Sequence, residues 1–334
     1  MPRSLEELVG AQLIVGLPGT TLSSDVAEHL RAIRAGGVIA FERNYESPEQ
    51  FRRLVGQLEE ALERSPVVMV DHEGGRIVRF TSGLTRFLDP LAIGQTQPPA
   101  DVERQGTIEA RELRALGVHV NLAPCVDVIV EGSDPVIGNR SYGNDPHRVA
   151  VLATARIRGL QAGGVAACAK HFPGLGAVPK DPHTHLPTVH LDWPAMRACH
   201  LIPFQAALQA GVATVMSSHV CYPKLDSTPR TPATFSRRLI QGLLRDELGF
   251  QGLVVTDDLE MGALQDLCEI GEAAVRSVEA GHDILLICHA LEHQRRAFSA
   301  LCQAYRQGRL QVKELEPRAE RIRRLSEQKS CSPP

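Results

Sequence analysis

The segment 170–188 reads KHFPGLGAVPKDPHTHLPT and holds three histidines, two lysines and an aspartate among glycines and prolines. So many titratable side chains in an irregular segment indicate a functional loop rather than a core element. Imidazole titrates near neutral pH and can transfer protons. Histidines spaced like His183 and His185 can also bind zinc. The loop therefore predicts acid–base catalysis or a metal site, with a solvated loop of no chemistry as the plain alternative.

Further polar side chains lie at the ends of short apolar runs elsewhere in the chain. Because the strands of a parallel barrel direct their carboxyl ends to one face, such side chains converge although they are far apart in sequence. The alternative is that each strand simply becomes polar where it meets solvent. Arginine and lysine beside carboxylates and histidines suit a polyhydroxylated or anionic ligand better than an apolar one. The side chains concerned are Asp71, Asn121, Asp127, Lys170, His171, His219, Asp257 and Asp258.

The elements that must position these residues alternate regularly. Eight short apolar runs lack polar–apolar alternation, so we predict strands buried on both faces. Helix-like segments such as 47–64 and 235–249 lie between most of these runs. This order predicts an α/β fold, a (β/α)8 TIM barrel forming a single domain over 1–334. A doubly wound open sheet is the alternative, but no GxGxxG follows the first run. The predicted strands are 12–17, 36–41, 66–70, 117–122, 164–170, 212–218, 252–257 and 283–288.

Composition argues against several other classes of protein. A formal net charge of −3, with 22% charged residues and no basic block, gives no reason to expect a nucleic-acid partner. No apolar run approaches the roughly 20 residues that span a bilayer, and the N-terminus lacks the usual signal-peptide design, so we expect no membrane association. Eight scattered cysteines without a CxxC pair indicate free thiols and a cytoplasmic location. We expect an ordered core over about 10–325 and a frayed tail at 328–334.

Three stretches resemble signatures of glycoside hydrolase family 3, namely DHEGGRIVRF (71–80), KHFPGLGAVPKDPHTHLP (170–187) and GLVVTDDLEM (252–261). The resemblance runs in order from about 10 to 290, and its closest branch is the single-domain bacterial β-N-acetylhexosaminidases. It implies release of terminal β-linked N-acetylglucosamine from peptidoglycan fragments (muropeptides) in cell-wall recycling. We expect a monomer acting on a small carbohydrate, with no cofactor and no metal. Shorter matches are GVIAFERN (37–44), NLAPCVDV (121–128) and GNRSYG (138–143).

A retaining glycosidase needs a nucleophile below the anomeric carbon and a proton donor beside the leaving oxygen. The resemblance assigns the nucleophile to Asp257 and the acid/base to His183, which pairs with Asp181. A carboxylate on one imidazole nitrogen fixes the tautomer and raises the basicity of the other nitrogen. The simpler interpretations are Asp257 as a helix N-cap, His183 as a solvated histidine, or His185 in its place. The resemblance assigns sugar binding to Asp71, Arg79, Arg140, Lys170, His171 and His219.

Three further carboxylates near these positions are expected to play supporting roles. Asp258 is expected to support the backbone or a neighbouring cation, and Glu73 and Asp127 to orient the basic residues or to lie in turns.

The loop also departs from the family pattern, which is close to KHFPGHGDTxxDSHxxLP. Proline restricts its own backbone and that of the residue before it. We therefore expect a loop that is stiffer than in the family or that closes differently over the substrate, with the acid/base pair retained. The departures are Leu175, Ala177, Val178 and Pro182.

Other functions fit parts of the pattern. A β-glucosidase or a glycoside phosphorylase could use the same scaffold, the latter because a neutral histidine base does not repel an incoming phosphate. From another class come a metal-dependent barrel hydrolase with His183 and His185 as ligands, and a catalytically silent sugar-binding protein. Metal barrels of the amidohydrolase kind carry HxH after the first strand, where this chain has GLPGTT (16–21).

Overall fold

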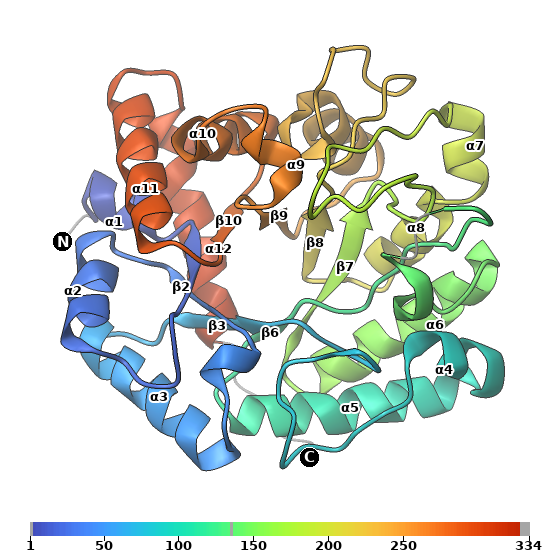
Figure 1. Ribbon diagram of the computed structural model, residues 1–334, viewed down its shortest axis with the longest axis horizontal. Coiled ribbons are helices and arrows are strands. Elements are labelled where there is room, and N and C mark those ends of the chain that lie inside the picture. The colour runs from blue at the N-terminus through green and yellow to red at the C-terminus, as the bar shows by residue number, and fades with distance from the viewer. Residues whose placement is uncertain (1–2, 134–135, 328–334) are drawn as a thin grey trace.

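The computed structural model describes residues 3–133 and 136–327, so the expected tail at 328–334 lies outside the described residues. Each of the eight apolar runs forms a strand: β1 (Leu13–Gly16), β2 (Gly37–Ala40), β3 (Val67–Val70), β6 (Val120–Asn121), β7 (Ala166–Phe172), β8 (Thr214–Ser217), β9 (Leu253–Asp258) and β10 (Ile284–Ile287). The strands are parallel and close into a barrel, because β1 pairs with both β2 and β10 (Figure 1). This closure confirms the predicted (β/α)8 barrel and excludes the open sheet.

Helices form an outer ring around the barrel (Figure 1). The helix predicted at 47–64 is α3 (Pro48–Leu62), and the Ser47 side chain caps it by accepting from the Gln50 N–H. The helix predicted at 235–249 is shorter and is wound as a π-helix, η4 (Arg238–Glu247), and the Ser236 hydroxyl accepts the Leu239 N–H at its start. The other α-helices are α1 (Leu5–Gly10), α2 (Ser24–Ala32), α4 (Pro90–Thr96), α5 (Pro99–Ala115), α6 (Pro146–Ala162), α7 (Trp193–Ala198), α8 (Leu201–Gln209), α9 (Gly262–Gln265), α10 (Ile270–Ala280), α11 (Leu291–Arg306) and α12 (Leu315–Glu327), and the short 3-10 helices are η1 (Glu42–Asn44), η2 (Gly138–Arg140), η3 (Ala233–Phe235) and η5 (Val312–Glu314).

Successive residues of each strand point alternately into the barrel and toward the helices. Ile14 and Met69 belong to the apolar cluster inside the barrel, to which α12 also contributes. Their neighbours Val15 and Val68 belong to the cluster between the barrel and the helices. Burial on both sides is why the strands read as continuous apolar runs. None of the described helices combines the length and the apolarity needed to cross a membrane.

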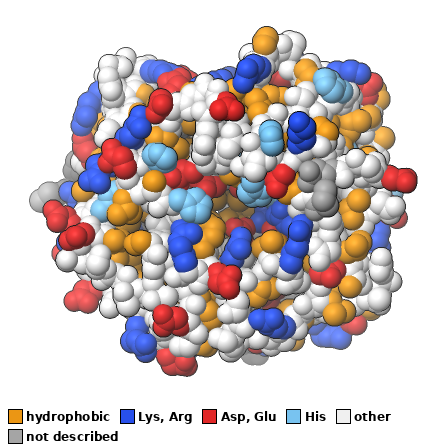
Figure 2. Space-filling model, viewed as in Figure 1, with side chains coloured by type: hydrophobic (Ala, Val, Ile, Leu, Met, Phe, Trp, Pro, Cys, Tyr) orange, Lys and Arg blue, Asp and Glu red, His pale blue; other side chains and the backbone are white. Residues whose placement is uncertain are grey.

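The carboxyl ends of the strands carry the loops that build the candidate site. A short antiparallel hairpin, β4 (His72–Gly74) and β5 (Ile77–Val78), follows β3 directly. β7 continues past the predicted run 164–170, so both Lys170 and His171 belong to the strand and not to the loop. The space-filling view shows a hollow near the centre of the molecule, with basic, acidic and histidine side chains gathered around it (Figure 2).

Candidate active site

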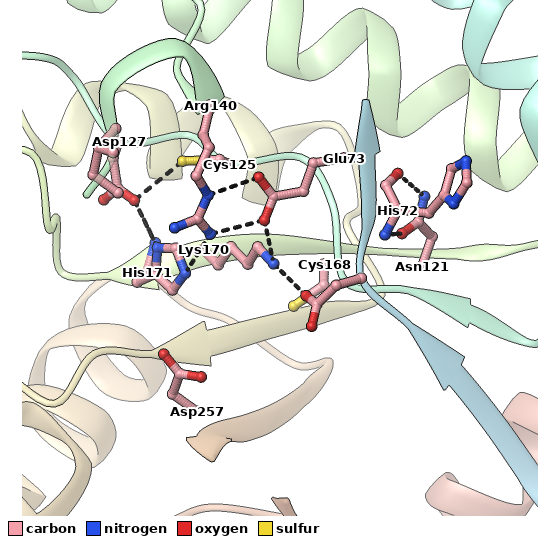
Figure 3. A network of polar contacts seen from close by, with 12 residues as sticks. His72, Glu73, Asn121, Cys125, Asp127, Arg140, Cys168, Lys170, His171 and Asp257 are labelled. Carbon is pink, nitrogen blue, oxygen red and sulfur yellow. Dashed lines mark hydrogen bonds and ion pairs between the residues drawn. The ribbon is translucent and has the colours of Figure 1, made fainter. Parts of the chain in front are cut away.

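A network of buried charges lies at the end of the barrel (Figure 3). The Lys170 Nζ atom is 2.6 Å from Asp71 Oδ1 and 2.7 Å from Glu73 Oε1. Glu73 also accepts two hydrogen bonds from Arg140, at 2.9 and 2.8 Å. The two cations outweigh the effect of burial, which by itself would raise the pKa of Glu73, and hold that pKa well below its usual range. Glu73 thus orients both basic residues, Lys170 and Arg140. This is the first of the two roles that the sequence predicts for it.

The carboxylate of Asp127 and the guanidinium of Arg140 hold the His171 ring between them. Its Nδ1 atom lies 2.7 Å from Asp127 Oδ2, and Arg140 Nη2 lies 3.3 Å from its Nε2 atom. Asp127 also accepts the backbone N–H groups of His171 and Leu175, at 3.1 and 2.5 Å. Because a carboxylate only accepts, Nδ1 carries a proton and Nε2 faces Arg140. The ring is therefore fixed in position and in tautomer.

Asp257, the last residue but one of β9, lies on the other side of this network (Figure 3). One of its oxygens accepts the Asp258 N–H at 2.9 Å. Burial would raise the pKa of Asp257, but the nearby His171 and His219 outweigh burial and leave it below its ordinary value. The residue lies within a strand and α9 begins only at Gly262, so the interpretation of Asp257 as an N-cap is wrong.

Asp258 supports the backbone, as expected. Its Oδ1 atom accepts the N–H groups of Glu260 and Cys288, and its Oδ2 atom lies 3.3 Å from His289 Nε2. The carboxylate thereby joins the end of β9 to the end of β10.

His219 is buried, and both of its ring nitrogens are bonded within the protein. Nδ1 lies 2.6 Å from the Thr234 hydroxyl, and Nε2 lies 2.9 Å from the Asp258 carbonyl oxygen. Burial lowers the pKa of His219. Because neither ring nitrogen is left for a sugar hydroxyl, this geometry does not support the predicted sugar contact. His219 instead contacts the end of β9 and stabilises it.

Arg79 follows β5 and lies near an aromatic ring at the edge of the site. Its guanidinium is 5.6 Å from the centre of the Phe41 ring, and Arg43 lies 4.5 Å from the same ring. The Nε atom of Arg79 is buried and has no hydrogen-bond partner among the described residues. An unpaired buried donor is unusual in a folded protein.

The predicted acid/base pair lies on the loop after β7. Asp181 Oδ1 is 2.6 Å from His183 Nδ1 and accepts the His183 N–H at 2.8 Å. The side chains of His183 and Asp181 are 59% and 39% exposed. Among the residues that the structure describes, His185 Nδ1 bonds only the neighbouring Thr184 hydroxyl, at 2.8 Å, and of the two histidines His183 has the carboxylate partner that the sequence predicts.

Two of the four residues at which this loop departs from the family pattern are buried. Leu175 and Val178 are 3% and 0% exposed and belong to the apolar core. The first half of the loop is therefore fixed by packing, while His183 lies in the exposed second half.

The structure also tests the metal alternative. Within 3–133 and 136–327, the one group of side chains with metal-ligand spacing is Cys125, Asp127 and His171, and it includes neither His183 nor His185. Burial and the nearby Asp127 raise the pKa of the Cys125 thiol well above its usual range. Its Sγ atom donates to Asp127 at 3.3 Å.

One predicted polar residue lies outside the site, and some neighbours were missed. Asn121 donates to Glu109 of α5 at 2.6 Å because, within β6, its neighbour Val120 takes the inward position.

Phe41 and Thr234 were not singled out, and an isolated phenylalanine or threonine carries no chemical signal in sequence. Phe41 follows a barrel strand, which is the only cue that it offers.

Comparison with known proteins defines the class. The model for "Glycosyl hydrolase family 3 N terminal domain" matches residues 5–325. A β-hexosaminidase of Nitrosomonas eutropha is 38% identical over 284 residues, covering 83% of this chain and 80% of that protein. A β-hexosaminidase of Stenotrophomonas maltophilia is 37% identical over 284 residues, with 83% of each chain covered. The chain therefore belongs to glycoside hydrolase family 3.

Solved structures agree with this assignment. A family 3 β-N-acetylglucosaminidase from Paenibacillus sp. superposes with a TM-score of 0.94 at 37% identity, over 98% of this chain. This chain spans only 63% of that protein's length. NagZ from Neisseria gonorrhoeae, in complex with N-trifluoroacetyl-D-glucosamine, gives a TM-score of 0.78 at 30% identity and covers 94% of this chain and 98% of NagZ.

Proposed function

We propose that this protein is a retaining exo-β-N-acetylglucosaminidase that releases terminal β-linked N-acetylglucosamine through a covalent glycosyl-enzyme on Asp257. The observation that carries the proposal is the combination of this partly buried carboxylate at the end of a barrel strand with the separate, exposed pair His183–Asp181. One group is suited to attack carbon and the other to exchange protons with solvent. The similarity to proteins named β-hexosaminidase and β-N-acetylglucosaminidase supports the choice of sugar.

In the first step the Asp257 carboxylate attacks the anomeric carbon and the bond to the leaving oxygen breaks. His183 gives that oxygen a proton, and Asp181 stabilises the imidazole in both charge states. In the second step His183 takes a proton from water, the water oxygen attacks the anomeric carbon, and the bond to Asp257 breaks. Two inversions give net retention of configuration. The lowered pKa of Asp257 supports this role, because the nucleophile must be ionised at neutral pH.

Sugar recognition is assigned to the buried charge network. Asp71 is partly exposed, whereas Lys170 beside it is buried, so the carboxylate can accept from a sugar hydroxyl while the ammonium holds it in place. Arg140 and His171 fix each other from a second direction. Arg79, with its guanidinium beside the Phe41 ring, is assigned to the edge of the sugar site.

We further propose that the natural substrates are peptidoglycan fragments and that the protein works in the cytoplasm as a monomer. The names of the relatives support the hexosaminide part of this proposal. The cysteines at the described positions are free thiols, which suits a reducing compartment.

The substrate assignment is tested with two aryl glycosides. We expect a higher kcat/KM for the β-N-acetylglucosaminide than for the β-glucoside, and an unchanged rate in excess EDTA. A higher value for the glucoside would make the protein a β-glucosidase. Formation of sugar 1-phosphate as the main product in millimolar phosphate would make it a phosphorylase. Binding of the aminosugar without turnover would leave only a sugar-binding protein.

The nucleophile is tested by substitution and by trapping. Asp257→Ala should lose about three or more orders of magnitude in kcat while keeping its fold, because it removes the carboxylate that forms the covalent intermediate. A slowly hydrolysed fluorosugar should label Asp257, as peptide mass spectrometry would show. Labelling of Asp258, or substantial activity in Asp257→Ala, would overturn the assignment.

A further inference from the structure

The second half of the catalytic loop is joined to the segment that follows the nucleophile strand. The Gly262 N–H donates to the His183 carbonyl oxygen at 3.0 Å, and the Ala263 N–H donates to the Pro182 carbonyl oxygen at 3.2 Å. Asp257 and Gly262 lie on the same short segment of chain, β9 to α9. The backbone of the acid/base residue is thus bonded to the segment that carries the nucleophile.

That segment is rigid enough to serve as a reference point. The Asp258 carbonyl oxygen accepts the Met261 N–H at 3.1 Å, closing the turn that leads to Gly262. Glu260 accepts the backbone N–H groups of His289 and Ala290, at 2.6 and 3.0 Å, and so joins the turn to the end of β10. The donor at Gly262 is therefore held at a fixed position relative to Asp257.

Only glycine permits the loop to come this close. A Cβ atom at Gly262 would lie 2.7 Å from the His183 carbonyl oxygen and 3.1 Å from Thr184 Cα. Both are backbone atoms, which cannot turn aside as the end of a flexible side chain can. The φ of Gly262 is outside the left-handed region, so alanine fits the local backbone and would favour the first turn of α9.

The rest of the loop depends on this contact. Val178 and Leu175 fix its first half in the core, and the backbone of Pro187 bonds Cys221 at its far end. Between them the side chains of Asp181 and His183 are 39% and 59% exposed, so their own packing does little to hold them, while the buried Pro182 lies against the β9–α9 segment through its carbonyl oxygen. A general acid contributes only when it lies within hydrogen-bond reach of the leaving oxygen.

We propose that Gly262 is a positioning residue for proton transfer. Because it has no side chain, the loop backbone can approach the end of β9, and this approach sets the position of His183 relative to Asp257. This inference rests on the proposed function. Alanine at 262 displaces the loop, whereas the nucleophile and the sugar-binding network stay in place. The loss should then appear only in reactions that need a proton donor.

The test compares Gly262→Ala with Gly56→Ala, a matched control in α3 where a Cβ meets nothing within 4 Å. Both are assayed on a β-linked N-acetylglucosamine disaccharide and on a dinitrophenyl glycoside, whose leaving group needs no proton. Gly262→Ala should lose about 10- to 100-fold in kcat/KM on the disaccharide and less than about 3-fold on the dinitrophenyl substrate. Gly56→Ala should match the unmodified protein on both, and the Tm of neither variant should fall.

A double-mutant cycle shows whether Gly262 acts through His183. In a His183→Ala background, Gly262→Ala should cost less than about 2-fold on the disaccharide, because the group that it positions is gone. Additive losses, equal losses on both substrates, or wild-type rates in Gly262→Ala would each overturn the inference. If His183→Ala itself shows no dependence on the leaving group, the proposed function fails instead.

Discussion

Two histidine–carboxylate pairs of nearly the same geometry lie on one face of this barrel. His171 and Asp127 are 2.7 Å apart, with side chains 5% and 0% exposed. His183 and Asp181 are 2.6 Å apart, with side chains 59% and 39% exposed. The distance between the partners therefore does not distinguish them, but their surroundings do.

The surroundings give each pair a different use. Asp127 also accepts two backbone N–H groups, and His171 contacts Arg140, so the buried pair is part of a fixed network. The exposed pair leaves His183 Nε2 open to a substrate and to water. The same two residue types thus serve as a structural support when buried and as a proton-exchanging group when exposed.

The largest effect is expected from Asp127→Ala. It leaves the His171 ring and the N–H groups of His171 and Leu175 without an acceptor, which should cost about 3 kcal/mol or more in the free energy of unfolding and nearly all activity. Asp127→Asn keeps an acceptor and should lose less. Asp181→Ala should change stability by less than about 0.5 kcal/mol, because the site is exposed. Urea denaturation measures all three, and equal losses for Asp127→Ala and Asp181→Ala would contradict the comparison.

Acid should weaken the buried network through Glu73. The folded-state pKa of this group lies well below its unfolded value near 4.5, so its contribution to stability is fully present above about pH 5 and is lost as the pH falls. Glu73→Gln leaves buried cations poorly paired and should cost about 3 kcal/mol at pH 7. The stability difference between Glu73→Gln and the unmodified protein should shrink between pH 5 and pH 3. A difference that stays constant over this range would show that Glu73 is not ionised in the network.

The smallest effect is expected from His185→Ala. His185 is exposed and bonds only its neighbour Thr184, so kcat/KM should change by less than about 3-fold on any substrate. A larger loss than in His183→Ala would mean that the two histidines have been assigned in the wrong order.

The sequence predicted the fold better than the site. Strands buried on both faces leave continuous apolar runs, and all eight runs formed barrel strands. The ends of those strands then located Asp71, Lys170 and Asp257. The direction of an individual side chain is harder to predict, since β6 turns Asn121 toward α5 although it occupies the same kind of position.

The sequence also does not predict how deeply a site residue is buried or which groups its side chain bonds. Nothing in the sequence distinguishes His219, with both nitrogens bonded, from His183, with one open. That difference depends on Thr234 and on the Asp258 carbonyl, which reach His219 only in the folded barrel. The contact of Gly262 with the loop likewise joins segments far apart in the chain.

The most direct test of the account is the leaving-group dependence of His183→Ala. If the exposed pair supplies the proton, kcat/KM should fall by about 100-fold or more for a β-linked N-acetylglucosamine disaccharide and by less than about 5-fold for the dinitrophenyl glycoside. His171→Ala should lower both values alike, because it damages the network that holds the sugar. Equal losses on the two substrates in His183→Ala would contradict the account and show that proton transfer is carried out elsewhere.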